Sequence, residues 1–311
     1  DWSSDVCSSD LSFNFYHRWY WRNFWFSLSS IERSGSMIKI LASRTFFKSV
    51  LIFNSIIVLA PLLFLINSSL RKTNDFALTP MKLARNPYWQ NYKDVWAGGN
   101  FPIYLKNSLI VTGGSLIVIL ALGLGAGFVL GRYQFKGHGL ILGFVLSGML
   151  VPAKLAIIPL FIQLKWMHLL DSHLGLILVY SSGALPAAIF ILSGFFRSLP
   201  TDLDSAARVD GASEFQLLMK VLMPLVRPGL AIVAIYSAIP IWNDFFLPLV
   251  FLQSPEKKTI MQGLTAFFGE YASQWGIIFA GLTIAALPLV TLYLILSEQF
   301  IKGLTAGAVK G

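Results

Sequence analysis

The sequence lacks the motifs of the common hydrolytic and nucleotide-binding sites. It contains no G-x-x-x-x-G-K-[ST] phosphate-binding loop, no G-x-S-x-G nucleophile elbow and no H-E-x-x-H zinc motif. His168 and His173 have Asp171 between them, but no cluster of further carboxylates or cysteines, so we interpret them as exposed loop histidines and not as metal ligands. We therefore expect this chain to have no catalytic residues, no bound metal or cofactor, and no ATP hydrolysis of its own.

The side chain whose chemistry stands out is Asp244, an ionisable residue in a long apolar stretch. An unpaired carboxylate in hydrocarbon is costly, so Asp244 must face a cavity or a partner. In one interpretation, Trp242, Asn243 and Asp244 line a translocation path. In the other, Asp244 caps a break in a helix rich in proline or pairs across a subunit interface. Lys154, in another apolar stretch, is a candidate partner.

A second distinctive stretch, residues 197–229, is the longest polar interruption in the second half of the chain. Thr201 followed three residues later by Asp204 predicts a capping box at the start of a short helix. That helix would run to about Val209. Gly211 would then form a corner, because glycine adopts positive φ without steric cost.

A second short helix is expected directly after this corner. Ser213 with Gln216 forms another capping box, and Pro224 and Pro228 end the helix. The helix carries a predicted apolar stripe at helical spacing, formed by Phe215, Leu218, Met219 and Leu222. A helix-turn-helix hairpin with such a stripe needs a partner to cover it.

Composition assigns the broad class of the protein. Of 311 residues, 55% are hydrophobic and 13% are charged, whereas a soluble globular protein carries about 25% charged residues. This indicates an all-α polytopic membrane protein. The net charge of +9 fits lysines and arginines at membrane edges. Because these residues form no stripe, a nucleic-acid partner is excluded.

Six stretches are long enough to cross a bilayer as helices, which takes about 20 residues each. They are expected near 46–67, 107–131, 139–162, 174–196, 230–252 and 276–297. The hairpin would then lie between the fourth and fifth helices. The distribution of lysine and arginine places both termini in the cytoplasm, although the first outer loop, about 68–106, is also basic. Aromatic residues in this loop either sit at the membrane interface or touch a partner protein outside the membrane.

The predicted spans differ in their small residues and prolines. Gly123, Gly127 and Gly131, with Gly125 between them, form a face for close helix packing, either within this chain or against a second membrane subunit. The third to sixth spans contain prolines, which loosen helices where a cavity or neighbour satisfies the freed backbone groups. We expect these four spans to surround a translocation path.

Residues 1–36 are expected to be a non-native extension. Their first eleven residues resemble a translated sequencing adapter, and the following aromatic and basic run is too short for a span. The alternative is an interfacial helix. The membrane domain would then extend from Met37 to residue 311, and the single cysteine, Cys7, would not belong to it.

The hairpin resembles the EAA loop of ABC-importer permeases. The matching residues are Ser205-Ala206-Ala207-Arg208-Val209-Asp210-Gly211-Ala212, followed by Met223-Pro224, and the family's glutamate is replaced by Ser205, with Asp204 beside it. The maltose-type carbohydrate permeases fit best, from about Met37 onward. Two further motifs carry this resemblance: Ile241-Trp242-Asn243-Asp244-Phe245 and the closing KGLTAGAVKG from Lys302.

The resemblance implies a permease subunit that imports sugars or oligosaccharides by alternating access in a bacterial or archaeal cytoplasmic membrane. Its implied partners are a second homologous permease, two ATPase subunits that use ATP and Mg²⁺, and an extracytoplasmic sugar-binding protein. The path residues would contact the sugar, with Trp242 stacking on an apolar sugar face. A flexible C-terminal tail would reach the ATPases through Lys302, Gly303 and Gly307. The implied ATPase-coupling residues are Asp204, Ser205, Ala206, Ala207, Asp210, Gly211, Phe215 and Leu218.

Other transport classes remain as alternatives. An ion-gradient-driven secondary transporter would use Asp244 as its coupling site, but it predicts inverted repeats and paired buried acids that are not apparent. A purely structural membrane subunit would not need the broken helices or Asp244. An ABC importer of an amino acid, polyol or phosphodiester would keep the hairpin and change only the substrate.

Overall fold

The computed structural model describes residues 36–98, 100–150 and 153–308, and the described chain is all helical. Residues 1–35 of the proposed extension lie outside this range. Four helices contain segments long and apolar enough to cross a membrane. These segments are Phe46–Ser69 of α2 (Ser36–Ser69), α5 (Phe101–Arg132), α8 (His173–Ser198), and Trp275–Ile301 of α15 (Trp275–Ala308).

A fifth candidate span is a bent pair of helical segments. Glu214–Leu225 and α12 (Arg227–Asn243) pass the same test together, with a bend of 77° between them. α12 ends at Asn243 with Asp244 as its C-cap, and α13 (Phe246–Phe251) begins three residues after Asn243. The predicted span 230–252 is therefore interrupted. The interruption lies between Pro240 and Pro248, although Pro240 itself is inside α12.

The predicted third span, 139–162, is not one continuous helix. The described residues form α6 (His138–Ser147), a short turn η1 (Gly148–Leu150), a second turn η2 (Ala153–Ala156) and α7 (Ile157–Trp166). Each apolar helix is shorter than a span. The prediction of six spans is therefore shown only in part, because the apolar run at 139–162 indicated length but not continuity. Gly148 and Pro152 both disfavour a helix interior.

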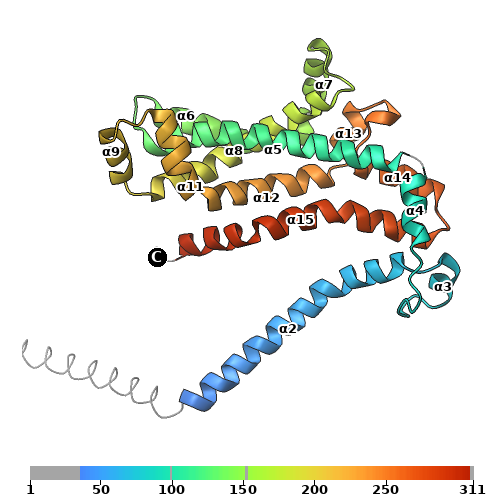
Figure 1. Cartoon of the computed structure of the whole chain (residues 1–311). Coiled ribbons are helices and arrows are strands. Elements are labelled where there is room, and N and C mark those ends of the chain that lie inside the picture. Colours follow the sequence, from blue (N-terminus) through green and yellow to red (C-terminus); the bar gives the residue numbers. More distant parts are fainter. Residues whose placement is uncertain (1–35, 99, 151–152, 309–311) are drawn as a thin grey trace, which may run out of the picture. The chain divides into compact units, whose positions relative to one another are not determined.

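The remaining helices are short and connect the long ones (Figure 1). α3 (Thr73–Leu78) and α4 (Gln90–Ala97) follow α2, and η4 (Pro255–Lys257) and α14 (Ile260–Glu270) precede α15. Between α8 and α12 lie four elements that form the hairpin region. They are α9 (Asp202–Val209), α10 (Glu214–Gln216), the π-helix η3 (Leu217–Leu222) and α11 (Met223–Leu225).

The glycine face of α5 packs against α8 within this chain, and the two helices run side by side (Figure 1). A Cβ atom added to these glycines would meet Ala188 Cβ at 3.2 Å from Gly123, Leu192 Cβ at 2.8 Å from Gly127, and Phe196 Cβ at 2.7 Å from Gly131. The facing residues on α8 have the same four-residue spacing. This face was predicted to pack either within the chain or against a second subunit. The structure shows that it packs within the chain.

Two buried clusters lie on either side of α12. The larger includes Phe128 of α5, Leu192 of α8 and Leu222 of the hairpin region. The smaller includes Trp242 at the end of α12 and Ile277 of α15. The packing of α12 thus links the hairpin end of the molecule to the region where the helix breaks at Asp244.

We predict that Gly127→Ala destabilises the protein by about 1–3 kcal/mol, the usual cost of overpacking a close contact. The added methyl group would lie 2.8 Å from Leu192 Cβ and 3.3 Å from the backbone nitrogen of Ser193. Gly125→Ala is the matched control, because no atom lies within 4 Å of its added Cβ. Thermal unfolding in detergent should separate the two variants; equal melting temperatures would contradict the packing assignment.

Candidate functional site

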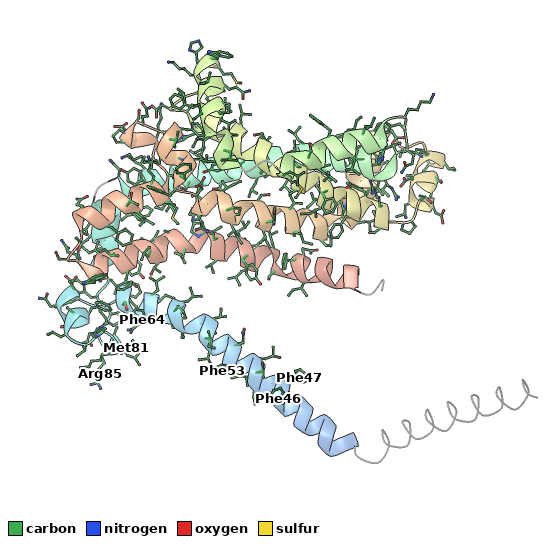
Figure 2. All side chains as sticks on the ribbon, turned by 180° about the vertical axis from the view of Figure 1, so that it is seen from behind. Phe46, Phe47, Phe53, Phe64, Met81 and Arg85 are labelled. Carbon is green, nitrogen blue, oxygen red and sulfur yellow. The ribbon has the colours of Figure 1, made fainter. Side chains whose placement is uncertain are left out.

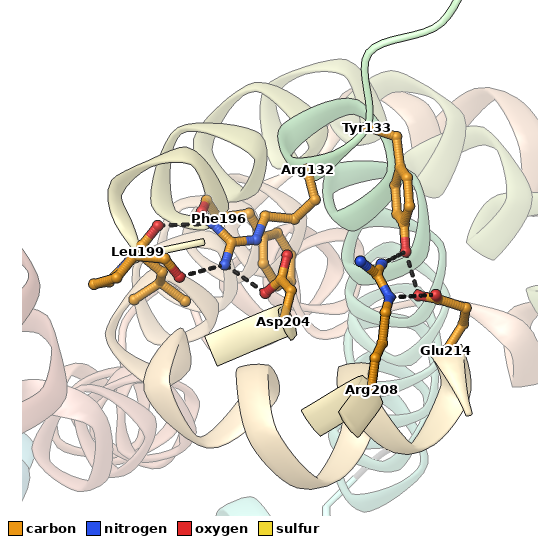
Figure 3. Close-up of polar contacts among 8 residues, drawn as sticks. Arg132, Tyr133, Phe196, Leu199, Asp204, Arg208 and Glu214 are labelled. Atoms are coloured by element: carbon orange, nitrogen blue, oxygen red, sulfur yellow. Dashed lines mark hydrogen bonds and ion pairs between the residues drawn. The ribbon is translucent and has the colours of Figure 1, made fainter. Parts of the chain in front are cut away.

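Arg132, the last residue of α5, holds the end of α8 and the start of α9 together. Its guanidinium donates to the carbonyl oxygens of Phe196 at 3.1 Å, Leu199 at 2.7 Å and Pro200 at 2.8 Å. The same group forms an ion pair with Asp204, with Nη2 and Oδ1 2.6 Å apart (Figure 3). The last carbonyls of a helix have no partners within the helix, and Arg132 supplies them here.

This ion pair is shielded from solvent. The side chain of Arg132 is 3% exposed and that of Asp204 is 12% exposed. A buried guanidinium that forms several charge-assisted hydrogen bonds fixes both distance and orientation. We call Arg132, Asp204 and the three carbonyls the Arg132 clamp. Neither the clamp nor the role of Arg132 was predicted, because its partners lie 64 to 72 residues away in the sequence.

The predicted capping box at Thr201 was wrong. α9 begins at Asp202, but Thr201 has helical backbone angles and its side chain makes no capping hydrogen bond. The carboxylate of Asp204, which would have completed the box, is bound by Arg132 instead. A tertiary ion pair has taken the place of a local cap.

The corner and the second capping box are confirmed. Gly211 has a φ of +79°, and the next helical segment begins immediately after Ser213. The Ser213 hydroxyl accepts from the backbone nitrogen of Gln216 at 3.3 Å, and the Gln216 side chain accepts from the Ser213 nitrogen at 2.9 Å. Both reciprocal bonds of a capping box are therefore present.

The predicted apolar stripe is divided between the interior and the surface. Leu218 and Leu222 are buried in the larger cluster, whereas Phe215 is 71% exposed and Met219 is also exposed. The stripe was predicted for a regular α-helix, but residues Leu217–Leu222 form a π-helix. Its wider turn changes which residues share a face. Leu218 therefore belongs to the core, and Phe215 remains the apolar residue that a partner can cover.

The predicted coupling residues in α9 and in the corner after it are also divided between the interior and the surface. Asp204 and Ala207 are buried. Ser205, Ala206, Asp210 and Gly211 are exposed, as is Val209 between them. The exposed residues of α9 and of the corner after it are thus small or polar apart from Val209.

A second polar cluster joins α5 to both arms of the hairpin, and it was also not predicted. The hydroxyl of Tyr133 donates to Glu214 and accepts from Arg208 Nη2 at 3.1 Å (Figure 3). Arg208 also pairs with Glu214, with Nε and Oε1 3.1 Å apart. Burial, followed by the hydrogen bond to Glu214, raises the pKa of Tyr133 above its usual value. Tyr133 therefore stays protonated and can donate at neutral pH.

The three predicted path residues are placed differently from one another. Trp242 is 3% exposed, and its indole nitrogen donates to the carbonyl oxygen of Ala285 at 3.1 Å. Asn243 is exposed and bonds to the Ile239 carbonyl of its own helix. In this conformation the Trp242 ring packs α12 against α15.

Asp244 caps the helix break, as one of the two interpretations expected. Its Oδ1 accepts from the backbone nitrogen of Phe246 at 2.9 Å, at the start of α13. Its Oδ2 accepts from the Tyr180 hydroxyl of α8 at 2.8 Å. The side chain of Lys154 lies outside what the structure describes. Both carboxylate oxygens of Asp244 thus have partners.

The histidine loop is a structural junction. Asp171 pairs with Lys257 at 3.1 Å and accepts from the hydroxyl and backbone nitrogen of Ser254. Burial would raise the pKa of Asp171, but these hydrogen bonds hold it well below its usual range. His168 is exposed as expected, whereas His173 is half-buried with Nε2 2.9 Å from the Lys257 carbonyl. Among the described residues, no His, Cys, Asp and Glu side chains gather as metal ligands would.

The expected flexible tail is helical over most of its length. α15 continues to Ala308, so Lys302, Gly303 and Gly307 lie on the helix that includes the last candidate span. The many small residues of the tail from Lys302 to Gly311 had suggested flexibility. Residues 309–311 lie outside the described range.

Comparison with known proteins identifies the class to which this arrangement belongs. Residues 123–305 match the family described as binding-protein-dependent transport system inner membrane component. The chain belongs to this family. It is therefore a permease of a binding-protein-dependent ABC transporter, a multi-pass protein of a prokaryotic inner membrane, and ATP is hydrolysed by a separate subunit.

Individual relatives cover most of the chain. The diacetylchitobiose uptake system permease protein NgcG of Streptomyces coelicolor is 35% identical over 264 residues, 84% of this chain and 87% of the relative. The arabinooligosaccharides transport system permease protein AraQ of Bacillus subtilis is 32% identical over 83% of this chain and 92% of the relative. A crystal structure of a bacterial ABC transporter for alginate import matches with a TM-score of 0.69 and 21% identity, covering 86% of this chain and 98% of that one. This last similarity establishes the fold.

We predict that Arg132→Ala loosens the hairpin and costs about 3–5 kcal/mol, because it leaves the Asp204 carboxylate buried without its partner. Asp204→Asn keeps a hydrogen-bond acceptor and should cost less. Trypsin cleavage after the exposed Arg208 measures the loosening directly. Asp202→Asn, an exposed position in the same turn of α9, is the control. Cleavage at the same rate in all four proteins would contradict the clamp.

Proposed function

We propose that this chain is the permease subunit of an ATP-driven importer of oligosaccharides, with the hairpin of residues 197–229 as its coupling element. The observation that carries the coupling role is the Arg132 clamp, which fixes a hairpin with an exposed tip to the ends of two long helices. The substrate class is supported by relatives named for diacetylchitobiose, arabinooligosaccharides, and melibiose, raffinose and stachyose.

The proposed complex contains this chain, a second homologous permease, two ATPase subunits and an extracytoplasmic sugar-binding protein. Both termini and the hairpin lie in the cytoplasm in this proposal. In this proposal α6 and α7 together make the remaining membrane crossing, so that the number of crossings is even. Each of the two helices is apolar but too short to cross alone.

The hairpin docks on the ATPase through its exposed residues. Phe215, with Val209, provides the apolar contact, and the small residues Ser205, Ala206 and Gly211 allow close approach. The buried residues do not contact the ATPase in this proposal. They fix α9 and η3 to the core, and they are Asp204, Ala207 and Leu218. When the ATPase dimer closes, the hairpin moves as a rigid body and carries the ends of α5 and α8 with it.

The sugar path lies beside the break between α12 and α13. Asn243 is exposed there, and Asp244 holds the break in place through Phe246 and Tyr180. Trp242 forms the wall behind them in this conformation and would reach a sugar face only if α12 moves on α15. At the other end of the chain, Lys302, Gly303 and Gly307 extend the last helix towards the ATPases.

We predict that Gly211→Asp abolishes ATPase binding and transport while membrane insertion is retained. The added side chain would be strained at φ +79° and would lie on the docking surface. Gly137→Asp is matched in backbone cost, since Gly137 has φ +88° and nothing lies within 4 Å of its added Cβ. A pull-down with the sugar-importer ATPase of the same genome compares the two; equal binding by both variants would remove the coupling assignment.

An ion-coupled secondary transporter is the alternative, and Asp244 distinguishes the two mechanisms. We predict that Asp244→Asn retains at least half of the sugar uptake, because an amide oxygen can still accept one of the two hydrogen bonds that hold the break. Asp244→Leu, which can accept neither, should lose uptake. If Asp244→Asn abolishes uptake while the protein stays folded, and uptake follows an ion gradient without ATP, the carboxylate is a coupling site.

A further inference from the structure

The loop after α2 has large apolar side chains on its outside. Leu78 is 82% exposed, Met81 is 86% exposed and Leu83 is 77% exposed. Lys82 and Arg85 alternate with them and are also exposed. Figure 2 shows Met81 and Arg85 pointing away from the ribbon of this loop. We call residues 78–85 the apolar-basic segment.

The backbone under this segment is held firmly. The buried guanidinium of Arg71 donates to the carbonyl oxygens of Thr79 at 2.7 Å and Pro80 at 3.0 Å. It also donates to the Thr79 hydroxyl at 2.9 Å. The exposed side chains therefore extend from an ordered platform, and their exposure is a property of the fold.

The segment lies at the depth of the last turn of α2. The side chain of Asn67 donates to the Lys82 carbonyl at 3.1 Å and accepts from the Ala84 nitrogen at 2.8 Å. Asn67 is part of the candidate span Phe46–Ser69. Each headgroup layer of a bilayer is about 5–8 Å thick, close to one helical turn. Residues 82–84 are therefore placed within a headgroup layer.

Charge and composition indicate what covers the segment. Leucine and methionine suit the boundary between headgroups and acyl chains, and lysine and arginine suit the phosphates of anionic lipids. In the described part of the chain, neither Lys82 nor Arg85 forms an ion pair. Lys72 differs, because its ammonium group lies over the Tyr88 ring at 5.2 Å. Within the described residues, two cations without an ion pair thus accompany three exposed apolar side chains in this segment.

We propose that the apolar-basic segment is a lipid-binding foot that inserts Leu78, Met81 and Leu83 into the membrane interface and holds anionic phospholipid headgroups with Lys82 and Arg85. The foot fixes the end of α2 and the platform around Arg71 at one depth in the bilayer. This inference does not depend on the transported substrate or on the coupling hairpin.

Depth-dependent quenching tests the insertion. The full chain with Cys7→Ser and Met81→Cys is labelled with a fluorophore and reconstituted in nanodiscs of zwitterionic and anionic lipid. Lipids brominated near the headgroup should quench the label strongly, and an aqueous quencher should have little effect. Leu62→Cys in the α2 span and Glu256→Cys in an exposed turn are the membrane and aqueous controls. A label at position 81 that behaves like the one at 256 would overturn the proposal.

The charge requirement has its own test. Removing one basic residue near an anionic surface weakens its attraction about fivefold, so Lys82→Gln and Arg85→Gln should each lower the preference for phosphatidylglycerol by that factor. Lys93→Gln, an exposed position on α4, should leave it unchanged. Equal preference in all three variants would contradict the role of these cations. Protection of the position-81 label by added binding protein, and not by lipid, would assign the segment to protein docking instead.

Discussion

The backbone of α5 approaches α8 so closely that one methyl group at Gly127 or Gly131 would collide with its neighbour. This approach places the last residue of α5, Arg132, directly beside the last carbonyls of α8. The guanidinium can then bind those carbonyls and Asp204 at the same time. The geometry of the hairpin therefore depends on the close contact of the α5 glycines with α8 and on one buried cation at the end of α5.

The chain has one end whose elements are held together by many tertiary contacts and another end whose helices are interrupted. The hairpin end is held by the Arg132 clamp, by the cluster around Tyr133 and by Leu222 in the core. The other end contains the helix break at Asp244, where the backbone nitrogen of Phe246 depends on the Asp244 side chain for its hydrogen bond. A transporter that converts ATPase closure into a change of access needs both: a part that transmits force without deforming and a part that rearranges.

Much of this could be predicted from the sequence. Local signals were sufficient for the class of protein, the positions of the long helices, the corner at Gly211 and the capping box at Ser213. They failed where tertiary contacts compete with local ones, as when Arg132 took Asp204 from its predicted cap. They also failed where a π-helix altered the spacing, so that Leu218 faces the core. An arginine at the end of a span looks like a membrane anchor until its distant partners are known.

The central claim is that the hairpin and the end of α5 move as one body when the ATPase closes. Spin labels at Gln134, just after α5, and at the exposed Val209 of α9 would measure this in the assembled transporter. A third label at Asn243, beside the helix break, reports on the path. The account predicts that the 134–209 distance is the same without nucleotide and with ATP, while the 209–243 distance changes. A 134–209 distance that shifts with ATP would show that the clamp opens during the cycle, and it would contradict the account.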